Sequence, residues 1–549
     1  MLEGDNEKNQ PPGSVVNTQT LLPPPPPRLN IARYCIAAQA AAHPDKTALI
    51  VAGSGAPQRL SYGALDLAVR RLAGGLRRLG LPHGARLMVR MDNDVPYVLT
   101  FFAALAAGLV PLPSAAALTS EEAEFLLADS EAAAIALSDD LALTHSPPAS
   151  VRVLTEEEIK RLAASAEPAD YADTQADDPA FLIYTSGTVG RPKGVLHGHR
   201  VAWGRRPMYQ GWYGITGDDV VLHAGAFNWT YTLGVGLIDP WANGATAVLY
   251  NGPADPAVWP QLIERFGVTI FATVPSLYRR ILKYASFHRD SLKTLRHGLT
   301  AGEALPPAVL EAWQAATGTP LYEALGMSEI STYISTGPGM EAKPGSPGRP
   351  QPGRRVAILD PGDADDDEAD EAPAAVMQPV RELPACAIGL LAVHRSDPGL
   401  MLGYWRRPEE EALVYRGEWF CGGDLASIDA DGYVWFHGRH DDILNPMGYR
   451  LSPLEIEGVL AHHPMVHEVA VGELAAGEGV HILAAFVVPH GAGDERQLLD
   501  WSKDHLATYK QPRMVVFVDH LPRTRNGKLL RRELPRQIED VQPPSLRDD

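Results

Sequence analysis

The chain has 549 residues, of which 45% are hydrophobic and 21% are charged. This length exceeds what one hydrophobic core usually serves, so we expect more than one globular domain. The formal net charge of −19 argues against general binding to nucleic acid or to an anionic membrane. The three cysteines, Cys35, Cys386 and Cys421, show no CxxC spacing, which argues against a zinc site or a disulfide framework and fits a reducing cytoplasm.

Residues 1–28 are predicted to form a disordered, proline-rich tail, because they are polar and close with the run Pro23–Pro27. They lack the charged start and apolar core of a signal peptide. The longest apolar run, Val98–Val110, stops at Pro111 and is too short to span a bilayer. It therefore predicts a buried helix rather than a membrane span.

From about Leu29 onward, helix-like and strand-like segments alternate. Ser61 can cap a helix whose apolar positions, such as Leu65 and Leu72, recur on one face. The strand-like run Arg86–Arg90 follows, and the buried helix comes next. Such alternation predicts an α/β fold with a mostly parallel sheet that helices cover on both faces.

The segment Tyr184–Gly194 has the composition of a phosphate-binding loop. It follows the apolar run Ala180–Ile183 and contains three glycines, three Ser/Thr hydroxyls, one arginine and one lysine. Closely spaced backbone N–H groups, together with hydroxyls and a cation, form a concavity that binds anions. No Gly-Lys-Ser/Thr leads into a helix, so this is not the Walker pattern. A flexible surface loop of similar composition is the alternative.

An aromatic cluster and a helix start follow further along the chain. Residues 226–234 combine Trp229 and Tyr231 with small side chains, which predicts either the wall of an apolar pocket or ordinary core packing. The run Val268–Pro275 reads as a strand, and Ser276 directly after it is a plausible helix cap.

Glycine turns place carboxylates at several later points. Residues 299–306 predict a strand end followed by a tight glycine turn. Asp424 follows two glycines, and a buried carboxylate at such a place suits bidentate capture of a sugar diol. Asp429–Tyr433 is a hairpin-turn signal. The acidic run from Asp360 to Pro379 predicts a solvated loop, to which we assign no chemistry.

The remaining chain reads as a linker followed by a small α+β unit. Charged residues, glycines and prolines are dense in Phe436–Pro453, as expected of a linker. Near the end, Lys528 lies at the tip of a glycine turn, where a lysine is usually only solvated.

These motifs, in this order, resemble those of the adenylate-forming superfamily, which comprises acyl-CoA synthetases, adenylation domains of peptide synthetases and luciferases. The wording TSGTVGRPKGVLHGH, AGEALP and GYRLSPLEIE is most similar to benzoate–CoA and medium-chain acyl-CoA ligases, and the resemblance extends from Leu29 to Leu534. It implies a large N-terminal domain over residues 29–438, with parallel-type sheets and covering helices. It also implies a small, mobile α+β domain over residues 439–549.

The resemblance implies roles for individual residues at the positions that match the family motifs. Those implied to contact ATP are Thr185, Ser186, Gly187, Thr188, Val189, Lys193, Gly302, Glu303, Glu323, Ala324, Leu325, Asp424 and Arg439. Those implied to be catalytic are Ser328, Glu329 and Lys528, with Glu329 also holding Mg²⁺. Those implied to line the acyl pocket are Trp229, as its gate, Tyr231, Ala301 and Gly302. The implied hinge is Asp441, and the implied CoA channel residues are Gly448 and Arg450.

Three departures from the family pattern are visible. Ser328 replaces the usual threonine and keeps its hydroxyl, whereas Leu325 replaces an aromatic residue that often stacks on adenine. The segment Asn445–Met447 lacks a lysine that some members place near the substrate.

The implied reaction joins a small carboxylic acid, aryl or short-to-medium acyl, to coenzyme A in two steps. The carboxylate attacks the α-phosphorus of ATP and pyrophosphate leaves; a thiol then displaces AMP. Because no carrier domain follows Lys528, we expect CoA as the acceptor, with a separate carrier protein as the alternative. A non-catalytic nucleotide-binding regulator and a luciferase-like oxygenase are more remote alternatives. Lys528 is also a candidate for charge-removing acetylation, which would make a lysine acetyltransferase and a deacetylase partners.

Overall fold

The structure is a computed structural model. It describes residues 22–439 apart from 142, 186–191, 254 and 363–379. It also describes residues 444 and 451, and residues 453–538 apart from 478–479, 507–509 and 524–528. Most of the predicted proline-rich tail and of the acidic run therefore lies outside the described residues. In the described part of the chain, no helix is both long and apolar enough to cross a membrane.

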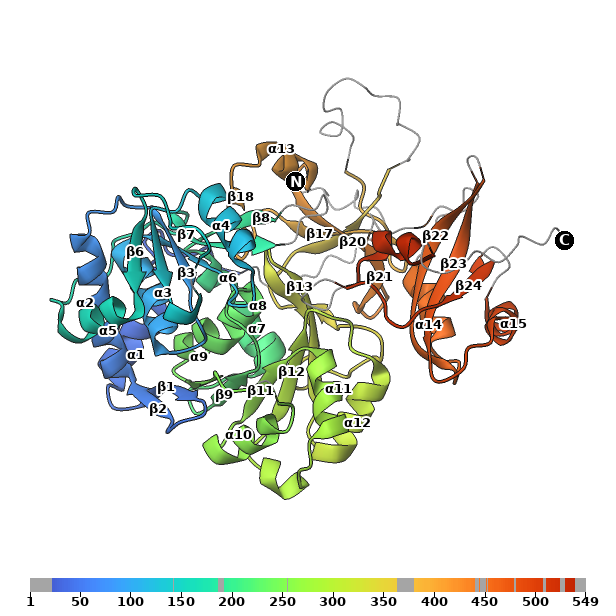
Figure 1. Ribbon diagram of the computed structural model, residues 1–549, viewed down its shortest axis with the longest axis horizontal. Helices are drawn as coiled ribbons and strands as arrows, with labels where there is room; N and C mark the ends of the chain where they lie inside the picture. Colours follow the sequence, from blue (N-terminus) through green and yellow to red (C-terminus); the bar gives the residue numbers. More distant parts are fainter. Residues whose placement is uncertain are drawn as a thin grey trace, which may run out of the picture.

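A nine-stranded sheet forms the centre of the large domain (Figure 1). Its order is β15-β14-β13-β12-β11-β9-β10-β1-β2; the strands from β13 to β1 run parallel, and both edges are antiparallel. The strands are β1 (Thr47–Ala52), β2 (Gln58–Ser61), β9 (Val220–His223), β10 (Thr246–Tyr250), β11 (Ile270–Thr273), β12 (His297–Ala301), β13 (Leu321–Met327), β14 (Ser331–Ser335) and β15 (Arg349–Pro350). The strand predicted within 268–275 is thus present as β11.

Helices cover both faces of this sheet, as strand–helix alternation requires. One face packs on a cluster that includes Trp259, Tyr278 and Trp313 from helices α10 (Val258–Phe266), α11 (Pro275–Tyr284) and α12 (Pro307–Thr317). The other packs on short helical segments, namely α6 (Val201–Gly204), α7 (Arg206–Met208), η3 (Tyr209–Tyr213), α8 (Thr230–Leu233), η4 (Gly234–Ile238) and α9 (Asp239–Ala242).

A second, four-stranded parallel sheet has the order β4-β3-β5-β6. Its elements are β3 (Arg86–Arg90), β4 (Val110–Pro113), β5 (Ala134–Leu137) and β6 (Arg152–Thr155), with α1 (Ala38–Ala42), α2 (Tyr62–Arg78), α3 (Val95–Ala107), α4 (Ser120–Asp129) and α5 (Glu156–Ser165). The predicted cap is confirmed, because the Ser61 side chain accepts a hydrogen bond from the Ala64 N–H. The apolar run from 98 to 110 is likewise a buried helix, ended by Gly108 in the left-handed region.

The expectation of one mostly parallel sheet was incomplete, because antiparallel sheets complete the large domain. A three-stranded sheet has the order β18-β8-β7, and a five-stranded sheet has the order β16-β17-β20-β19 with β21 paired to β20. These strands are β7 (Pro179–Thr185), β8 (Lys193–Gly198), β16 (Val356–Leu359), β17 (Gly389–His394), β18 (Gly403–Tyr404), β19 (Tyr415–Arg416), β20 (Trp419–Ile428) and β21 (Val434–Arg439); α13 (Pro408–Leu413) lies between β18 and β19 in the chain. The two-residue strands carry no periodic signal that a sequence pattern could reveal.

The C-terminal segment forms a small α+β domain with its own core, drawn in orange and red in Figure 1. Its sheet has the order β22-β23-β24, with the first pair antiparallel and the second parallel. The elements are α14 (Pro453–Leu460), β22 (Val466–Gly477), β23 (Val480–Pro489), α15 (Glu495–His505), β24 (Met514–Phe517) and the 3₁₀ segment η10 (Arg531–Ile538).

A fully buried ion pair locks the interior of the large domain beside β14. Arg205 donates from Nε to Asp239 Oδ1 at 2.7 Å and from Nη2 to Asp239 Oδ2 at 2.6 Å. Its Nη1 donates to the hydroxyl of Ser331 at 2.6 Å. Ser331 has a φ of +69°, which is uncommon for a residue other than glycine. The pair therefore helps to hold a strained residue shortly after Ser328 and Glu329.

We predict that Asp239→Ala lowers the apparent free energy of unfolding by on the order of 3–5 kcal/mol, because it leaves a buried guanidinium uncompensated. The double change Arg205→Met/Asp239→Leu should cost less, since no charge then stays buried. The exposed pair Lys503–Asp500 serves as a control, because Asp500→Ala should leave the stability nearly unchanged. Urea unfolding followed by tryptophan fluorescence measures the free energy of unfolding of all three variants. If Asp239→Ala were as stable as the double variant, or more stable, this explanation would be contradicted.

Candidate active site

The predicted phosphate loop is the connection of a β-hairpin. Thr185 closes β7, Lys193 opens β8, and the two residues are directly paired across the antiparallel ladder. The loop therefore leads into a strand, in agreement with its departure from the Walker pattern. Ser186, Gly187, Thr188 and Val189 lie outside the described residues, so the structure fixes only the base of the loop.

One tyrosine connects this hairpin to the predicted metal-holding carboxylate. The Tyr404 hydroxyl donates to Oε1 of Glu329 at 2.7 Å, and the ammonium of Lys193 lies 4.0 Å from the centroid of the Tyr404 ring. Burial, followed by the neighbouring Glu329, raises the pKa of Tyr404, so it acts as a neutral donor. Lys193 is also 3.8 Å from Oε2 of Glu410. Tyr404 thus contacts Lys193 through the face of its ring and Glu329 through its hydroxyl.

The turn that carries Ser328 and Glu329 is held from several sides. The Met401 N–H donates to the Glu329 carbonyl at 2.7 Å, and Nε2 of buried His197 lies 2.9 Å from the Ser328 carbonyl. Burial lowers the pKa of His197 to about 3, so this ring is neutral and can donate to the carbonyl. These bonds fix the backbone at the end of β13, and Tyr404 then fixes the Glu329 side chain.

The segment from Ala301 to Leu305 forms the predicted glycine turn. Gly302 has a φ of +92°, in the left-handed region that glycine adopts without steric cost. Glu303 accepts from both the hydroxyl and the N–H of Ser276, at 3.0 and 3.2 Å. The expectation that Ser276 caps a helix is therefore wrong: Val274 occupies the cap position, Pro275 begins α11, and Ser276 binds Glu303 instead.

Glu323 ties the same turn to β13. Its Oε1 accepts from the Leu305 N–H at 2.9 Å, and its backbone exchanges hydrogen bonds with Thr336. Burial raises the pKa of Glu323 to about 7, although the bond from Leu305 acts in the opposite direction. Its neighbour Ala324 is buried beside Ala301, and Leu325 packs at the edge of a separate cluster formed by the antiparallel strands.

Asp424 and Arg439 face each other across two antiparallel strands of the five-stranded sheet. They are a direct cross-strand pair, with Arg439 Nη1 3.1 Å from Asp424 Oδ1 and 2.5 Å from the Gly422 carbonyl. Asp424 is buried. A Cβ on Gly422 would lie 2.3 Å from the sulfur of Met327, so this strand passes close to the end of β13. The sugar-diol candidate and the metal-binding candidate therefore belong to adjoining strands.

The aromatic candidates divide between two clusters. Tyr231 packs with buried Ala301 and Ala324, and its hydroxyl donates to the Thr273 carbonyl at 3.2 Å. Trp229, at the N-cap of α8, packs instead against the cluster that contains Phe227. The structure thus brings Tyr231 and Ala301 together at the C-terminal edge of the nine-stranded sheet, next to Gly302. Trp229 packs against a different cluster.

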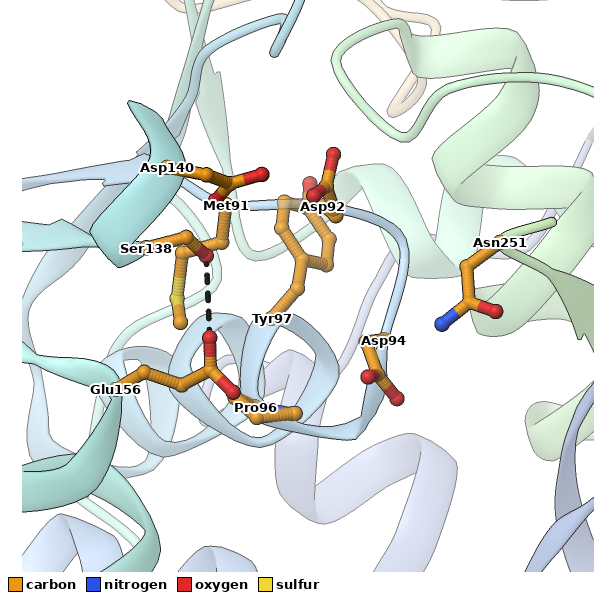
Figure 2. A pocket seen from close by; sticks show the side chains of 9 residues that line it. All are labelled: Met91, Asp92, Asp94, Pro96, Tyr97, Ser138, Asp140, Glu156 and Asn251. Carbon is orange, nitrogen blue, oxygen red and sulfur yellow. Dashed lines mark hydrogen bonds between the residues drawn. The ribbon is translucent and has the colours of Figure 1, made fainter. Parts of the chain in front are cut away.

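A separate pocket lies beside the N-terminus of α3, and Figure 2 shows its acidic lining. Asp92, Asp94, Asp140 and Glu156 line it, and the Ser138 hydroxyl is 3.4 Å from Glu156. Burial, followed by the neighbouring carboxylates, raises the pKa of Asp92. Four carboxylates would repel a triphosphate, which excludes this pocket as the ATP site.

The donor set at Glu329 suits a magnesium ion that is shared with a nucleotide. Within the described ranges, no group of three or more His, Cys, Asp or Glu side chains could hold a metal. Mg²⁺ commonly takes one or two carboxylates and completes its shell with water and substrate phosphates. One oriented carboxylate next to a phosphate-type hairpin meets that requirement.

Several of the expected residues cannot be located, and one important residue was missed. Lys528, Asp441, Gly448 and Arg450 lie outside the described residues. Tyr404 was missed because it belongs to no glycine or charge motif, and its contact with Glu329 joins positions 75 residues apart. The pairing of the two-residue strand β18 with β8 brings it into place.

Comparison with known proteins gives consistent matches over most of the chain. Residues 36–405 match the family model described as AMP-binding enzyme, and residues 455–528 match the model of its C-terminal domain. The benzoate–CoA ligase of Thauera aromatica is 33% identical over 493 residues, which cover 86% of this chain and 90% of that protein. The 3-hydroxybenzoate–CoA ligase of Aromatoleum sp. (strain CIB) is 30% identical over 493 residues, with 86% and 91% covered.

A solved structure agrees with these matches. The benzoate CoA ligase from Burkholderia xenovorans LB400 has a TM-score of 0.79 and 31% identity, covering 92% of this chain and 99% of that one. The chain therefore belongs to the AMP-binding enzyme family of the adenylate-forming superfamily, and it is an AMP-forming acid–CoA ligase.

Proposed function

We propose that this enzyme activates an aryl or short-to-medium acyl carboxylic acid with ATP and transfers the acyl group to coenzyme A. The observation that carries the proposal is the pair of contacts made by Tyr404, with Lys193 over its ring and Glu329 at its hydroxyl, which joins the 185–193 hairpin to an oriented carboxylate. Beside it, Tyr231 and small residues form an apolar wall that suits an aryl or compact acyl group. The aromatic acids named in two similar ligases support the aryl assignment.

The chemistry depends on neutralising charge more than on removing a proton. A carboxylic acid is already ionised at pH 7, so it needs no general base. It must approach the α-phosphorus of a triphosphate that is itself an anion. Reactions of this kind rely on positioning and on a fixed field of donors. We assign that field to the 185–193 hairpin and to Lys528, with Ser328 contacting the α-phosphate.

The remaining proposed contacts are those with the ribose, the adenine and the metal ion. We assign the ribose hydroxyls to Asp424, which Arg439 holds in place, and the adenine to the Gly302–Glu303 turn and the segment 323–325. We assign Mg²⁺ to Glu329, where the ion would supply positive charge at the phosphates. Trp229 stays the proposed gate of the acyl pocket.

The thiol step needs a second arrangement of the small domain. We keep residues 29–438 and 439–549 as the proposed domains, Asp441 as the hinge, and Gly448 and Arg450 as the CoA channel, because a few residues can absorb the rotation. The similar CoA ligases favour CoA over a carrier protein as the acceptor. The free cysteines Cys35, Cys386 and Cys421 support a cytoplasmic location.

A substrate panel tests this function directly. The purified chain receives MgATP and a series of aryl and aliphatic acids, with and without CoA, and pyrophosphate, AMP and thioester are measured. We expect pyrophosphate release that depends on the acid, and we expect the enzyme to turn over repeatedly only when CoA is present. Turnover with a carrier protein but not with CoA would favour the alternative acceptor.

We predict that Lys528→Ala lowers the rate of acyl-adenylate formation by about a hundredfold or more but spares thioester formation from supplied acyl-AMP. The reason is that the lysine would act on two anions that meet only in the first step. Single-turnover assays of each half-reaction measure this. Enzyme acetylated on Lys528 should behave like the alanine variant, because acetylation removes the same charge. Equal losses in both half-reactions, or full activity after acetylation, would count against the assignment.

We predict that Tyr404→Phe lowers the adenylation rate about tenfold and raises the Mg²⁺ concentration needed for half-maximal activity. It removes the hydroxyl that orients Glu329 but keeps the ring beneath Lys193. A matched control is Tyr433→Phe, whose hydroxyl donates to the Glu341 carbonyl and whose ring also lies beneath a lysine, Lys343. An unchanged Mg²⁺ dependence in Tyr404→Phe would exclude this positioning role.

We predict that Glu323→Gln becomes more stable relative to the wild type as the pH rises from about 4.5 to 7. The unfolded Glu323 ionises from its ordinary pKa of 4.5, whereas the folded carboxyl stays protonated until about 7. The wild type therefore loses stability across this window, by up to about 3 kcal/mol for a shift of this size, and the loss is constant above it. Urea unfolding at pH 5 and 7.5 measures the difference, with exposed Glu311→Gln as the control; parallel pH profiles of wild type and Glu323→Gln would refute the prediction.

A further inference from the structure

His223 is a buried histidine that none of the contacts described above uses. It is the last residue of β9, is paired with Ala272 of β11, and is only 4% exposed. Its ring packs edge-on against Tyr231, with 4.7 Å between the ring centroids and 71° between the planes. Because Tyr231 is a proposed wall residue of the acyl pocket, the imidazole lies beside that wall.

Neither ring nitrogen of His223 has a hydrogen-bond partner among the described residues. The other buried histidines of the described chain each use at least one nitrogen. His197 pairs with the Ser328 carbonyl, His199 accepts from the Ile31 N–H at 3.1 Å, and His297 bonds to the backbone of Tyr213. Buried polar groups in native proteins are almost always paired. Among the buried histidines of the described residues, His223 is thus the one with no partner at either ring nitrogen.

Burial lowers the pKa of His223 to about 3, so the ring is neutral at physiological pH. A neutral imidazole offers one N–H donor and one nitrogen acceptor. A hydroxyl can satisfy either nitrogen, an amino group can donate to the acceptor, and a carbonyl can accept from the donor. A carboxylate or an ammonium would instead need a charged or well-solvated partner.

The immediate surroundings of the ring are small or apolar. A Cβ on Gly225 would lie 3.0 Å from Cε1 and 3.2 Å from Nδ1 of His223, so only glycine leaves this edge uncrowded. Ala301 and Ala324 belong to the cluster of Tyr231, and the Tyr231 hydroxyl is already engaged by the Thr273 carbonyl. Such a wall accepts a mainly hydrocarbon group and leaves the imidazole as the polar contact for a substituent on it.

A second element holds this corner in place. Asn93, between β3 and α3, donates to the Gly225 carbonyl at 2.9 Å, and the Tyr97 hydroxyl donates to the Phe227 carbonyl at 2.7 Å. The turn that flanks His223 is therefore tied to the neighbouring sheet.

We propose that His223 is a specificity-determining residue that hydrogen-bonds a neutral polar substituent, a hydroxyl, amino or carbonyl group, on the aryl or acyl part of the substrate. The inference rests on the proposed function, because it requires the Tyr231 wall to be the acyl pocket. An acid that lacks the substituent leaves the buried imidazole unpaired. Sites built to pair a substrate polar group discriminate strongly against analogues without it.

The test compares matched pairs of acids on the full-length enzyme: benzoate with its three hydroxy and three amino isomers, and hexanoate with 6-hydroxyhexanoate. We expect the wild type to favour at least one substituted acid by about tenfold or more in kcat/KM. His223→Leu should remove that preference by losing activity on the substituted acid, whereas His223→Gln, which keeps a donor and an acceptor, should retain most of it.

His297→Leu is the matched control, because it also replaces a buried histidine of the same sheet, at the first residue of β12. Its preference should equal that of the wild type. If His297→Leu and His223→Leu lost the preference alike, the effect would be structural and the proposal would be overturned.

A binding readout separates this inference from the proposed function. Dissociation constants are measured by calorimetry for non-reactive acyl-sulfamoyl adenosines that carry the same pairs of acyl groups. We expect the substituted analogue to bind the wild type about tenfold more tightly and His223→Leu about equally. Absence of pyrophosphate release with every acid would count against the proposed function. Release with equal preference in the wild type and His223→Leu, or equal analogue affinities in both, would overturn the role of His223 alone.

Discussion

Two negatively charged reactants have to meet on a protein whose own formal charge is −19. A carboxylate and a triphosphate repel each other, and the overall field of the chain repels both. The site therefore needs positive charge and hydrogen-bond donors close to the reacting groups. The described residues show how part of this is arranged: Lys193 stands over the ring of Tyr404, Tyr404 orients Glu329, and Arg439 compensates Asp424. The acidic pocket at α3 illustrates the opposite arrangement, which an anion would avoid.

The site lies where three sheets with different strand directions adjoin. The parallel sheet supplies the end of β13, the three-stranded sheet supplies β8 and β18, and the five-stranded sheet supplies Asp424 and Arg439. Each contributes one part, and the contacts of Tyr404 and Met401 with Glu329 join the three-stranded sheet to the end of β13. The described parts of the candidate site thus lie on or directly beside regular strands, which are rigid supports.

Local sequence patterns predicted the parts of this arrangement that depend on local physics. The cap at Ser61, the apolar helix ended by Gly108 and the turn at Gly302 follow from side-chain capping, burial and glycine geometry within a few residues. The family resemblance, rather than local patterns, marked Asp424, Glu329 and Glu323 together as candidate nucleotide- or metal-binding residues. Sequence patterns could not predict Tyr404 or His223, because both derive their importance from partners, or from the lack of partners, far away in the chain. Ser276 was misassigned for a related reason, since its hydroxyl binds Glu303 across space.

The most direct test of the account is a crystal structure of the full chain with a non-reactive aryl-adenylate. We expect its phosphate between the 185–193 hairpin and Glu329, its ribose hydroxyls on Asp424, and its aryl group against Tyr231 and His223. An adenylate bound elsewhere, or one whose phosphate contacts neither the hairpin nor the side of Glu329, would contradict the assignment of this site.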